Sequence, residues 1–141
     1  MAFNKELKEA YKLKVLIVED DISTQLLYKM NIESWELPIE ITSMGNGWNG
    51  IVDISENVPD LVITDLNMPL MDGFSMIKAL RSLSDLPNMV IVVVTGKDRQ
   101  EISEQWDIPE DIKLFCKNPI PFEEIKALVI QLINKNSPAN I

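Results

Sequence analysis

Histidine is absent from this chain of 141 residues, and cysteine occurs once, at Cys116. The lack of histidine excludes histidine-based zinc sites, serine-type catalytic triads and phosphotransfer onto a histidine of the chain's own. A single cysteine cannot form an internal disulfide, and we expect Cys116 to be a small buried strand residue. Any histidine chemistry in which this protein takes part must therefore come from another molecule.

Basic residues are also scarce, with 13 Lys and Arg against 22 Asp and Glu and a formal net charge of -9. Nucleic-acid binding needs a basic face, so direct contact with nucleic acid is not expected. No apolar run reaches membrane-spanning length, and the start Met1–Glu6 lacks the apolar stretch of a signal peptide. We therefore expect a cytoplasmic protein without membrane contact.

Short apolar runs alternate with segments of helical period along the chain. A content of 46% hydrophobic and 25% charged residues is typical of one globular domain. The run Val90–Val94 is apolar on both faces, as expected for a central parallel strand covered by helices on both sides. The alternation predicts an α/β fold with a doubly wound parallel sheet. The expected strands are Lys14–Val18, Ile39–Ser43, Asp60–Thr64, Met89–Val94 and Ile112–Cys116.

Helical segments are expected between and after these strands. The clearest is the last, in which Ile125, Leu128 and Leu132 belong to one apolar stripe. The weakest has only Ile102 and Trp106 as apolar anchors at helical spacing. The expected helices are Ser23–Glu33, Trp48–Glu56, Phe74–Leu83, Asp98–Trp106 and Phe122–Asn134.

An amphipathic stripe that includes Phe3, Leu7 and Tyr11 precedes the first strand and predicts an extra N-terminal helix, within an extension over residues 1–13. This helix either caps the domain or provides a homodimer or partner contact, and both alternatives stay open. The domain itself is expected over residues 14–135, followed by a flexible tail at 136–141.

Acidic residues follow two of the apolar runs, Asp65 after one and the pair Glu19 and Asp20 after another. The carboxyl ends of parallel strands meet at one edge of a sheet, which is where ligands bind in open α/β folds. Like charges gathered there repel, so the arrangement needs a cation, a proton or a lysine among them. The next residue, Asp21, is expected to cap the following helix instead.

Five features in chain order carry a family resemblance. They are the acid pair Glu19-Asp20, Asp65, the turn Met68-Pro69-x-x-Asp72-Gly73, then Thr95 and Lys117. In order and spacing they resemble response-regulator receiver domains, the phosphoacceptor half of two-component signalling. The match runs from about Lys14 to Lys135. It implies a flavodoxin-like fold with five parallel strands in the order 2-1-3-4-5, helices on both faces and the extra N-terminal helix in addition.

The resemblance implies that Asp65 accepts a phosphoryl group from a sensor histidine kinase or a histidine phosphotransfer protein. Thr95 and Lys117 would then contact the phosphoryl oxygens, because phosphoryl transfer to a carboxylate joins two negative reactants. Such a domain is not an enzyme acting on other molecules, since it promotes only its own phosphorylation and dephosphorylation. With no fused output domain expected, it would signal to an unknown downstream protein target through a changed protein-binding face.

The resemblance also implies a magnesium ion at the carboxylates. Asp20 and Asp65 would bind Mg²⁺ directly, Glu19 through water, and Asn67 through its backbone carbonyl. Magnesium uses few carboxylates and keeps several waters, which suits this ligand set. The turn that follows Asn67 is interpreted as architectural, because it shapes the loop and starts the next helix.

Two departures from the family pattern lie near the end of the fifth strand. Asn118 separates Lys117 from Pro119, whereas the family has proline directly after the lysine. We expect Asn118–Pro119 to be the peptide bond at which the choice between cis and trans arises. A bulge at Asn118 would then keep Lys117 inward. Leu114 occupies the place of a common family aromatic, and Phe115 beside it points to the opposite face of the strand.

Two alternatives remain beside the phosphoacceptor. One is a degenerate receiver that acts as a phosphorylation-independent scaffold, an alternative that the Asn118 insertion keeps open. The other is a magnesium-dependent phosphatase with an aspartyl-phosphate intermediate. That class usually has a second acid two residues after the nucleophile, where this chain has Asn67.

Overall fold

A computed structural model describes residues 11–68, 70–82, 89–117 and 119–137 as an α/β domain. Its strands run in the order β2-β1-β3-β4-β5, and every neighbouring pair is parallel. The expected fold and strand order are therefore confirmed. The elements are β1 (Leu13–Val18), α2 (Ile22–Ser34), β2 (Ile39–Met44), α3 (Gly47–Glu56), β3 (Leu61–Thr64), α4 (Gly73–Ser82), β4 (Val90–Thr95), α5 (Arg99–Ser103), β5 (Lys113–Cys116) and α6 (Phe122–Asn136).

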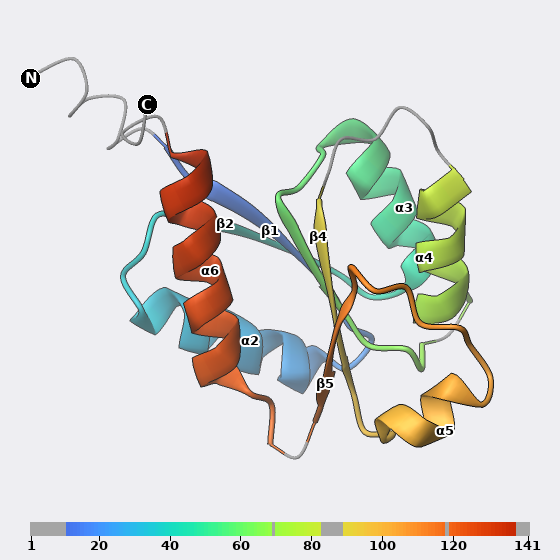
Figure 1. Cartoon of the computed structure of the whole chain (residues 1–141). Coiled ribbons are helices and arrows are strands. Elements are labelled where there is room, and N and C mark those ends of the chain that lie inside the picture. The colour runs from blue at the N-terminus through green and yellow to red at the C-terminus, as the bar shows by residue number, and fades with distance from the viewer. Residues whose placement is uncertain (1–10, 69, 83–88, 118, 138–141) are drawn as a thin grey trace, which may run out of the picture.

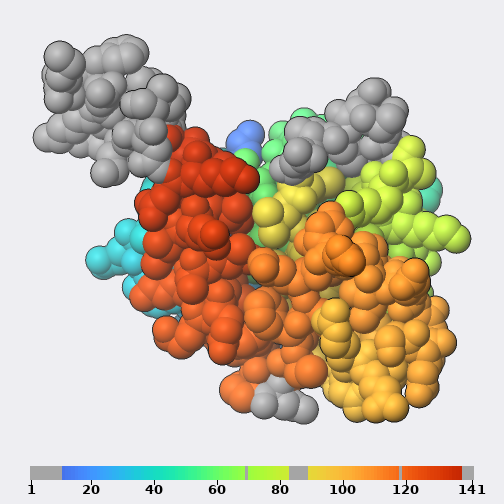
Figure 2. Space-filling view, in the orientation of Figure 1, coloured from blue at the N-terminus to red at the C-terminus, as the bar shows by residue number. Residues whose placement is uncertain are grey.

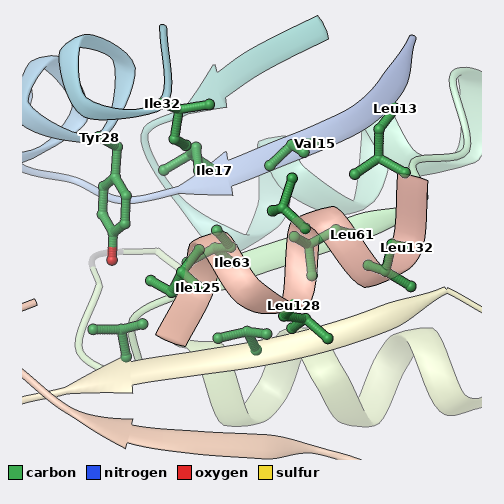
Figure 3. Close-up of a cluster of buried hydrophobic side chains, with 13 residues drawn as sticks. Leu13, Val15, Ile17, Tyr28, Ile32, Leu61, Ile63, Ile125, Leu128 and Leu132 are labelled. Atoms are coloured by element: carbon green, nitrogen blue, oxygen red, sulfur yellow. The ribbon is translucent and has the colours of Figure 1, made fainter. Parts of the chain in front are cut away.

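Helices cover both faces of the sheet (Figure 1). On one face, Val15 and Ile17 of β1 pack with the buried sides of α2 and α6, as the close-up of this cluster shows (Figure 3). On the other face, Leu16 and Val18 pack with α3, α4 and α5. Successive strand residues thus point to opposite layers, and β1 and β3 are apolar throughout because both of their faces are covered. In the space-filling view, α6 lies beside the α5–β5 region (Figure 2).

Short polar residues start several of these helices. Asp21 caps α2, because its carboxylate accepts hydrogen bonds from the Thr24 N–H at 3.0 Å and the Thr24 hydroxyl at 2.6 Å. Asp98 caps α5 through the Glu101 N–H at 2.8 Å. Both side chains supply acceptors that the first helical turn lacks. Within the described residues, no helix is long and apolar enough to span a membrane.

The α5 expectation needs the largest correction. The structure ends this helix at Ser103, after five residues, whereas the sequence pattern suggested Asp98–Trp106. Ile102 is the buried anchor of this short helix, and Trp106 packs beyond its end, edge-on to Phe74 at 4.9 Å between ring centroids. Beyond the helix end, Trp106 is held by its N–H, which donates to the Ile102 carbonyl at 2.9 Å, and by its packing on Phe74.

Other element ends differ from expectation by one or two residues. The fourth strand, for example, extends to Thr95 but begins at Val90 instead of Met89. The expected N-terminal helix and the Asn118–Pro119 bond lie outside the described residues. Cys116, which was expected to be buried, is exposed at the end of β5, because β5 is an edge strand of the sheet. Tyr11, the last residue of the expected N-terminal stripe, packs against the α2–α6 side of the core.

Candidate functional site

Lys117 lies at the centre of the carboxyl edge of the sheet. Its N–H donates to the Thr95 carbonyl at 2.7 Å, which continues the β4–β5 pairing past the end of β5. From there its Nζ reaches Asp65 Oδ2 at 3.0 Å and Glu19 Oε1 at 3.2 Å. The side chain therefore points inward although Asn118 separates it from Pro119. This orientation counts against the scaffold alternative, which would have Lys117 turned to solvent.

Asp65 follows the buried strand β3 and is held by its own loop. Its Oδ1 accepts hydrogen bonds from the N–H of Leu66 at 2.6 Å and of Asn67 at 3.3 Å. Its Oδ2 contacts Lys117, so both carboxylate oxygens have donors. The two backbone donors were not foreseen from the sequence, although an Asp that bonds to the next N–H groups is a common turn pattern. The result is a fixed, mostly buried carboxylate.

The turn after Asp65 packs tightly against it. The Gly73 N–H donates to the Leu66 carbonyl at 3.0 Å, and a Cβ at Gly73 would overlap the carbonyl oxygen of Asp65. Asp72 Oδ1 accepts from the Ser75 N–H at 2.8 Å at the start of α4. The turn is thus architectural, as expected, and the glycine is required by this close approach.

Glu19 and Asp20 differ in exposure although they are neighbours in sequence. Glu19 is 3% exposed, whereas Asp20 is exposed. Burial raises the pKa of Glu19, and the adjacent Asp20 carboxyl raises it further, while the Asp21 N–H and Lys117 act in the opposite direction. The expected crowding of acids at this edge is therefore present, and Lys117 is the cation that partly offsets it.

The ammonium group of Lys117 is stabilised in its charged form. Burial alone would lower the pKa of Lys117, but the hydrogen bond and charge of Asp65, followed by those of Glu19, outweigh burial and leave it raised. Lys117 is therefore a permanent cation at neutral pH. It can pair with a carboxylate or with another anion placed at the same point.

Thr95 ends β4 at the same edge and is completely buried. Its hydroxyl oxygen accepts from the Lys97 N–H at 3.3 Å. The neighbouring strand pair β3–β4 places it one strand away from Asp65. The structure thus gathers Glu19, Asp65, Thr95 and Lys117 at one edge, from four different strand ends.

The donor chemistry suits a hard cation. Glu19, Asp20 and Asp65 offer carboxylate oxygens, which Mg²⁺ prefers. Among the described residues no group of three or more acidic, histidine or cysteine side chains forms a ready-made metal cage. Magnesium needs no such cage, because it keeps several waters, so these residues fit it.

The fifth strand directs its side chains as the alternation predicted. Leu114 packs into the cluster with α3, α4 and α5, and Phe115 packs on the opposite face with α2 and α6. The position that the family commonly fills with an aromatic therefore carries an aliphatic side chain here.

A family model for the response regulator receiver domain matches residues 15–129. A probable chemotaxis protein CheY of Rhizobium etli is 31% identical over 121 residues, which cover 85% of this chain and 92% of that protein. A probable C4-dicarboxylate response regulator DctR of Bacillus subtilis is 39% identical over 90 residues, which cover 64% of this chain and 39% of that protein. The similarity to the longer relative is thus limited to part of its length.

Solved structures share the fold at lower identity. A CheY-like receiver domain from Methylobacillus flagellatus superposes with a TM-score of 0.71 at 21% identity, covering 86% of this chain and 99% of the other. The receiver domain of sensor histidine kinase PA1611 from Pseudomonas aeruginosa, with a magnesium ion in its active-site cleft, gives 0.73 at 19% identity, covering 88% and 99%.

Proposed function

Because the chain belongs to the response regulator receiver domain family, we propose that Asp65 is the residue that receives the phosphoryl group in two-component signalling. The observation that carries this proposal is the Lys117 Nζ at 3.0 Å from Asp65 Oδ2 on the edge that also holds Glu19 and Thr95. The phosphodonor is the phosphohistidine of a sensor histidine kinase or of a histidine phosphotransfer protein, since the chain has no histidine of its own.

The transfer is a displacement at phosphorus. An Asp65 carboxylate oxygen forms the new O–P bond while the N–P bond of the donor breaks and its electron pair returns to the imidazole. The Leu66 and Asn67 N–H groups hold Asp65 Oδ1, which orients the carboxylate toward the incoming phosphorus. The protein thus supplies a positioned nucleophile.

Charge on the transferred group is met by Lys117 and Thr95. The Lys117 ammonium pairs with a phosphoryl oxygen once Asp65 becomes an acyl phosphate, and the Thr95 hydroxyl donates to another. Glu19, Asp20, Asp65 and the Asn67 carbonyl would hold Mg²⁺, which neutralises charge on the phosphoryl oxygens when bound. Each partner acts where negative charge gathers.

The signal leaves through a protein-binding face near β4, α5 and β5. A phosphoryl group bound to Thr95 and Lys117 pulls the ends of β4 and β5 toward it. The helix α5 follows β4 directly, so it is displaced with the strand end. The short α5 has one buried anchor, Ile102, so it moves at little cost in packing. Leu114 is aliphatic, so no aromatic side chain at this position takes part in the change. The domain promotes only its own phosphorylation and dephosphorylation, in the cytoplasm. It passes the signal on by binding a downstream protein.

The test is phosphorylation of the purified full-length chain by acetyl phosphate with magnesium, followed by intact mass. We expect one acid-labile phosphoryl group on the wild type and on Asp72→Asn, which makes the same chemical change in the neighbouring turn. Asp65→Asn should gain none, because an amide is not a nucleophile here. Full modification of Asp65→Asn would place the acceptor elsewhere.

A further inference from the structure

Leu70 has an unfavourable backbone conformation in the turn that follows Asp65. Its φ is 65°, and among the described residues Glu36, with a φ of 54°, is the only other non-glycine residue at positive φ. A leucine adopts this left-handed region at a cost in free energy, because its Cβ crowds the backbone. Glycine and asparagine suit the region better, so the turn itself does not explain why a leucine stands here.

The surroundings of the turn hold Leu70 in this conformation. The Gly73 N–H donates to the Leu66 carbonyl at 3.0 Å, and the Gly47 N–H of α3 donates to the Met71 carbonyl at 3.0 Å. A Cβ at Gly47 would overlap that Met71 oxygen, so α3 lies directly against the turn. A relaxed backbone at Leu70 would disturb these contacts. The strain therefore remains in the folded domain.

The side chain of Leu70 makes no packing contact that would offset this cost. It is 88% exposed, the largest exposed fraction of any large apolar side chain that the structure describes. Trp48, at the start of α3, is 59% exposed. The two residues flank the Gly47–Met71 hydrogen bond, on the side of the sheet where α3 and α4 lie next to each other (Figure 1). Backbone strain and an exposed apolar side chain thus coincide beside the site.

A protein that phosphorylates Asp65 has to approach this turn. The phosphorus of its phosphohistidine must come within bonding distance of the Asp65 carboxylate, which the turn surrounds. The phosphohistidine is anionic, and so are Glu19, Asp20 and the chain as a whole, with its net charge of -9. Residues 66–71 include no charged side chain. At this part of the edge, attraction has to come from apolar contact, which does not depend on charge.

We propose that Leu70 anchors the phosphodonor protein, with its side chain entering an apolar patch next to the donor's phosphohistidine. The inference rests on the proposed function of Asp65 and adds a residue that binds the donor on the α3–α4 side of the site. Burial of Leu70 in the complex removes apolar surface from water, which stabilises the complex and not the free domain. The leucine therefore lowers the stability of the free domain and raises its affinity for the donor.

Phosphoryl transfer from a protein and from a small molecule tests the proposal on the full-length chain. The protein probe is the histidine kinase of the same genome that, autophosphorylated with radiolabelled ATP, labels the wild type fastest. Its kcat/KM is divided by the rate constant for acetyl phosphate, so that any change in the chemistry at Asp65 cancels. Leu70→Asn should lower this ratio at least about tenfold, chiefly through KM, because a buried apolar contact with the donor is lost. Leu70→Met keeps an apolar side chain and should retain most of the ratio.

Thermal melting separates this role from a structural one. Leu70→Asn should raise the melting temperature by about 2–4 °C, because asparagine tolerates positive φ. A merely structural leucine would give a variant that melts lower. Glu36→Asn is the matched control, since it relieves the same kind of strain at the end of α2 far from Asp65. It should melt higher and leave the transfer ratio unchanged.

Three results would overturn the proposal while Asp65 is still labelled by acetyl phosphate. They are a wild-type ratio in Leu70→Asn, an equal loss in Leu70→Met, and a wild type that no kinase labels faster than acetyl phosphate does. Leu70→Gly, which also suits positive φ, decides if Leu70→Asn does not fold. Failure of acetyl phosphate to label Asp65 would instead contradict the proposed function, and this inference with it.

Discussion

Lys117 holds together two carboxylates that would otherwise repel. Glu19 is almost fully buried, and Asp65 shares the same ammonium group, with N–O distances of 3.2 Å and 3.0 Å. A cation at this point offsets the free-energy cost of burying the two carboxylates. An unpaired buried charge destabilises the fold much more than a paired one. The lysine therefore has a structural effect that can be measured apart from phosphorylation.

Lys117→Ala should lower the metal-free stability of the domain, by on the order of 1–3 kcal/mol, because it leaves two acids without their shared donor. Adding Glu19→Gln should restore part of the loss, since one of the repelling charges is removed. Urea denaturation in the presence of a chelator measures both effects. Lys113→Ala, which removes an exposed lysine from β5, the strand before Lys117, is the control. Equal stability of wild type and Lys117→Ala would show that Lys117 does not offset the repulsion between Glu19 and Asp65.

Tyr28 shows how burial fixes a proton. The side chain is 3% exposed and packs edge-on against Phe122, with ring centroids 5.7 Å apart. Burial raises the pKa of Tyr28, and the negative charges of Glu19 and Asp65 raise it further. The folded protein therefore keeps this proton at a pH where the unfolded chain, with a tyrosine pKa of about 10, loses it.

The free energy of unfolding should consequently fall as the pH rises above about 10, because the unfolded state then binds fewer protons than the folded state. Below about pH 10 the contribution of Tyr28 is fully present. Tyr28→Phe has no proton to lose, so its stability should fall less between about pH 8 and pH 11. Urea midpoints of both proteins at each pH provide the comparison. Parallel losses in the two proteins would show that Tyr28 is not the cause.

At the scale of elements, the start of α4 is fixed by contact with the site. Gly73 lies so close to Asp65 that any side chain must push the strand end and the helix apart. The helix position and the carboxylate position are thus set together.

Gly73→Ala should therefore destabilise the domain by about 1–3 kcal/mol, the usual cost of forcing an atom into a packed contact. It should also slow phosphorylation by acetyl phosphate, because Asp65 shifts with the turn. Gly45→Ala is the matched control, since a Cβ there meets nothing within 4 Å. Thermal melting and intact mass report the two effects. A Gly73→Ala variant with wild-type melting would show that the turn yields without cost.

At the scale of the whole molecule, the acids of the site and the net negative charge both destabilise the folded domain through repulsion. A chain with 22 acidic and 13 basic residues repels itself, and the carboxyl edge concentrates that repulsion at Glu19, Asp20 and Asp65. A divalent cation that binds only the folded domain should stabilise it for both reasons.

Magnesium at about ten times its dissociation constant should stabilise the fold by about 1.4 kcal/mol and raise the melting temperature. Asp20→Asn should melt higher than wild type without metal, because one repelling charge is gone, and should respond less to magnesium. Sodium chloride of equal ionic strength controls for screening. A wild-type melting curve that ignores millimolar magnesium would remove the metal site from the proposed mechanism.

The sequence by itself determined the sheet and the chemistry at its edge. Alternating apolar runs and helical periods predicted all five strands, because strands buried on both faces must be apolar throughout. Glu19 and Asp65 could be foreseen at one edge, because the carboxyl ends of parallel strands meet there. Thr95, Lys117 and the strand order followed from the resemblance to receiver domains. The helix after Thr95 was predicted too long, since a tryptophan at helical spacing gives the same pattern whether or not a helix carries it.

Only the tertiary structure decided how these residues face one another. The inward direction of Lys117 depends on the continued pairing with Thr95, which the Asn118 insertion left open. The close approach of Gly73 to Asp65 joins a helix start to a strand end, and no local pattern reports such a distance. The edge position of β2 follows from strand order, since a strand becomes an edge only when the whole sheet is assembled. Helix and strand propensities depend on residues that are close in sequence. The orientation, contacts and exposure of a side chain depend on neighbours that are distant in sequence.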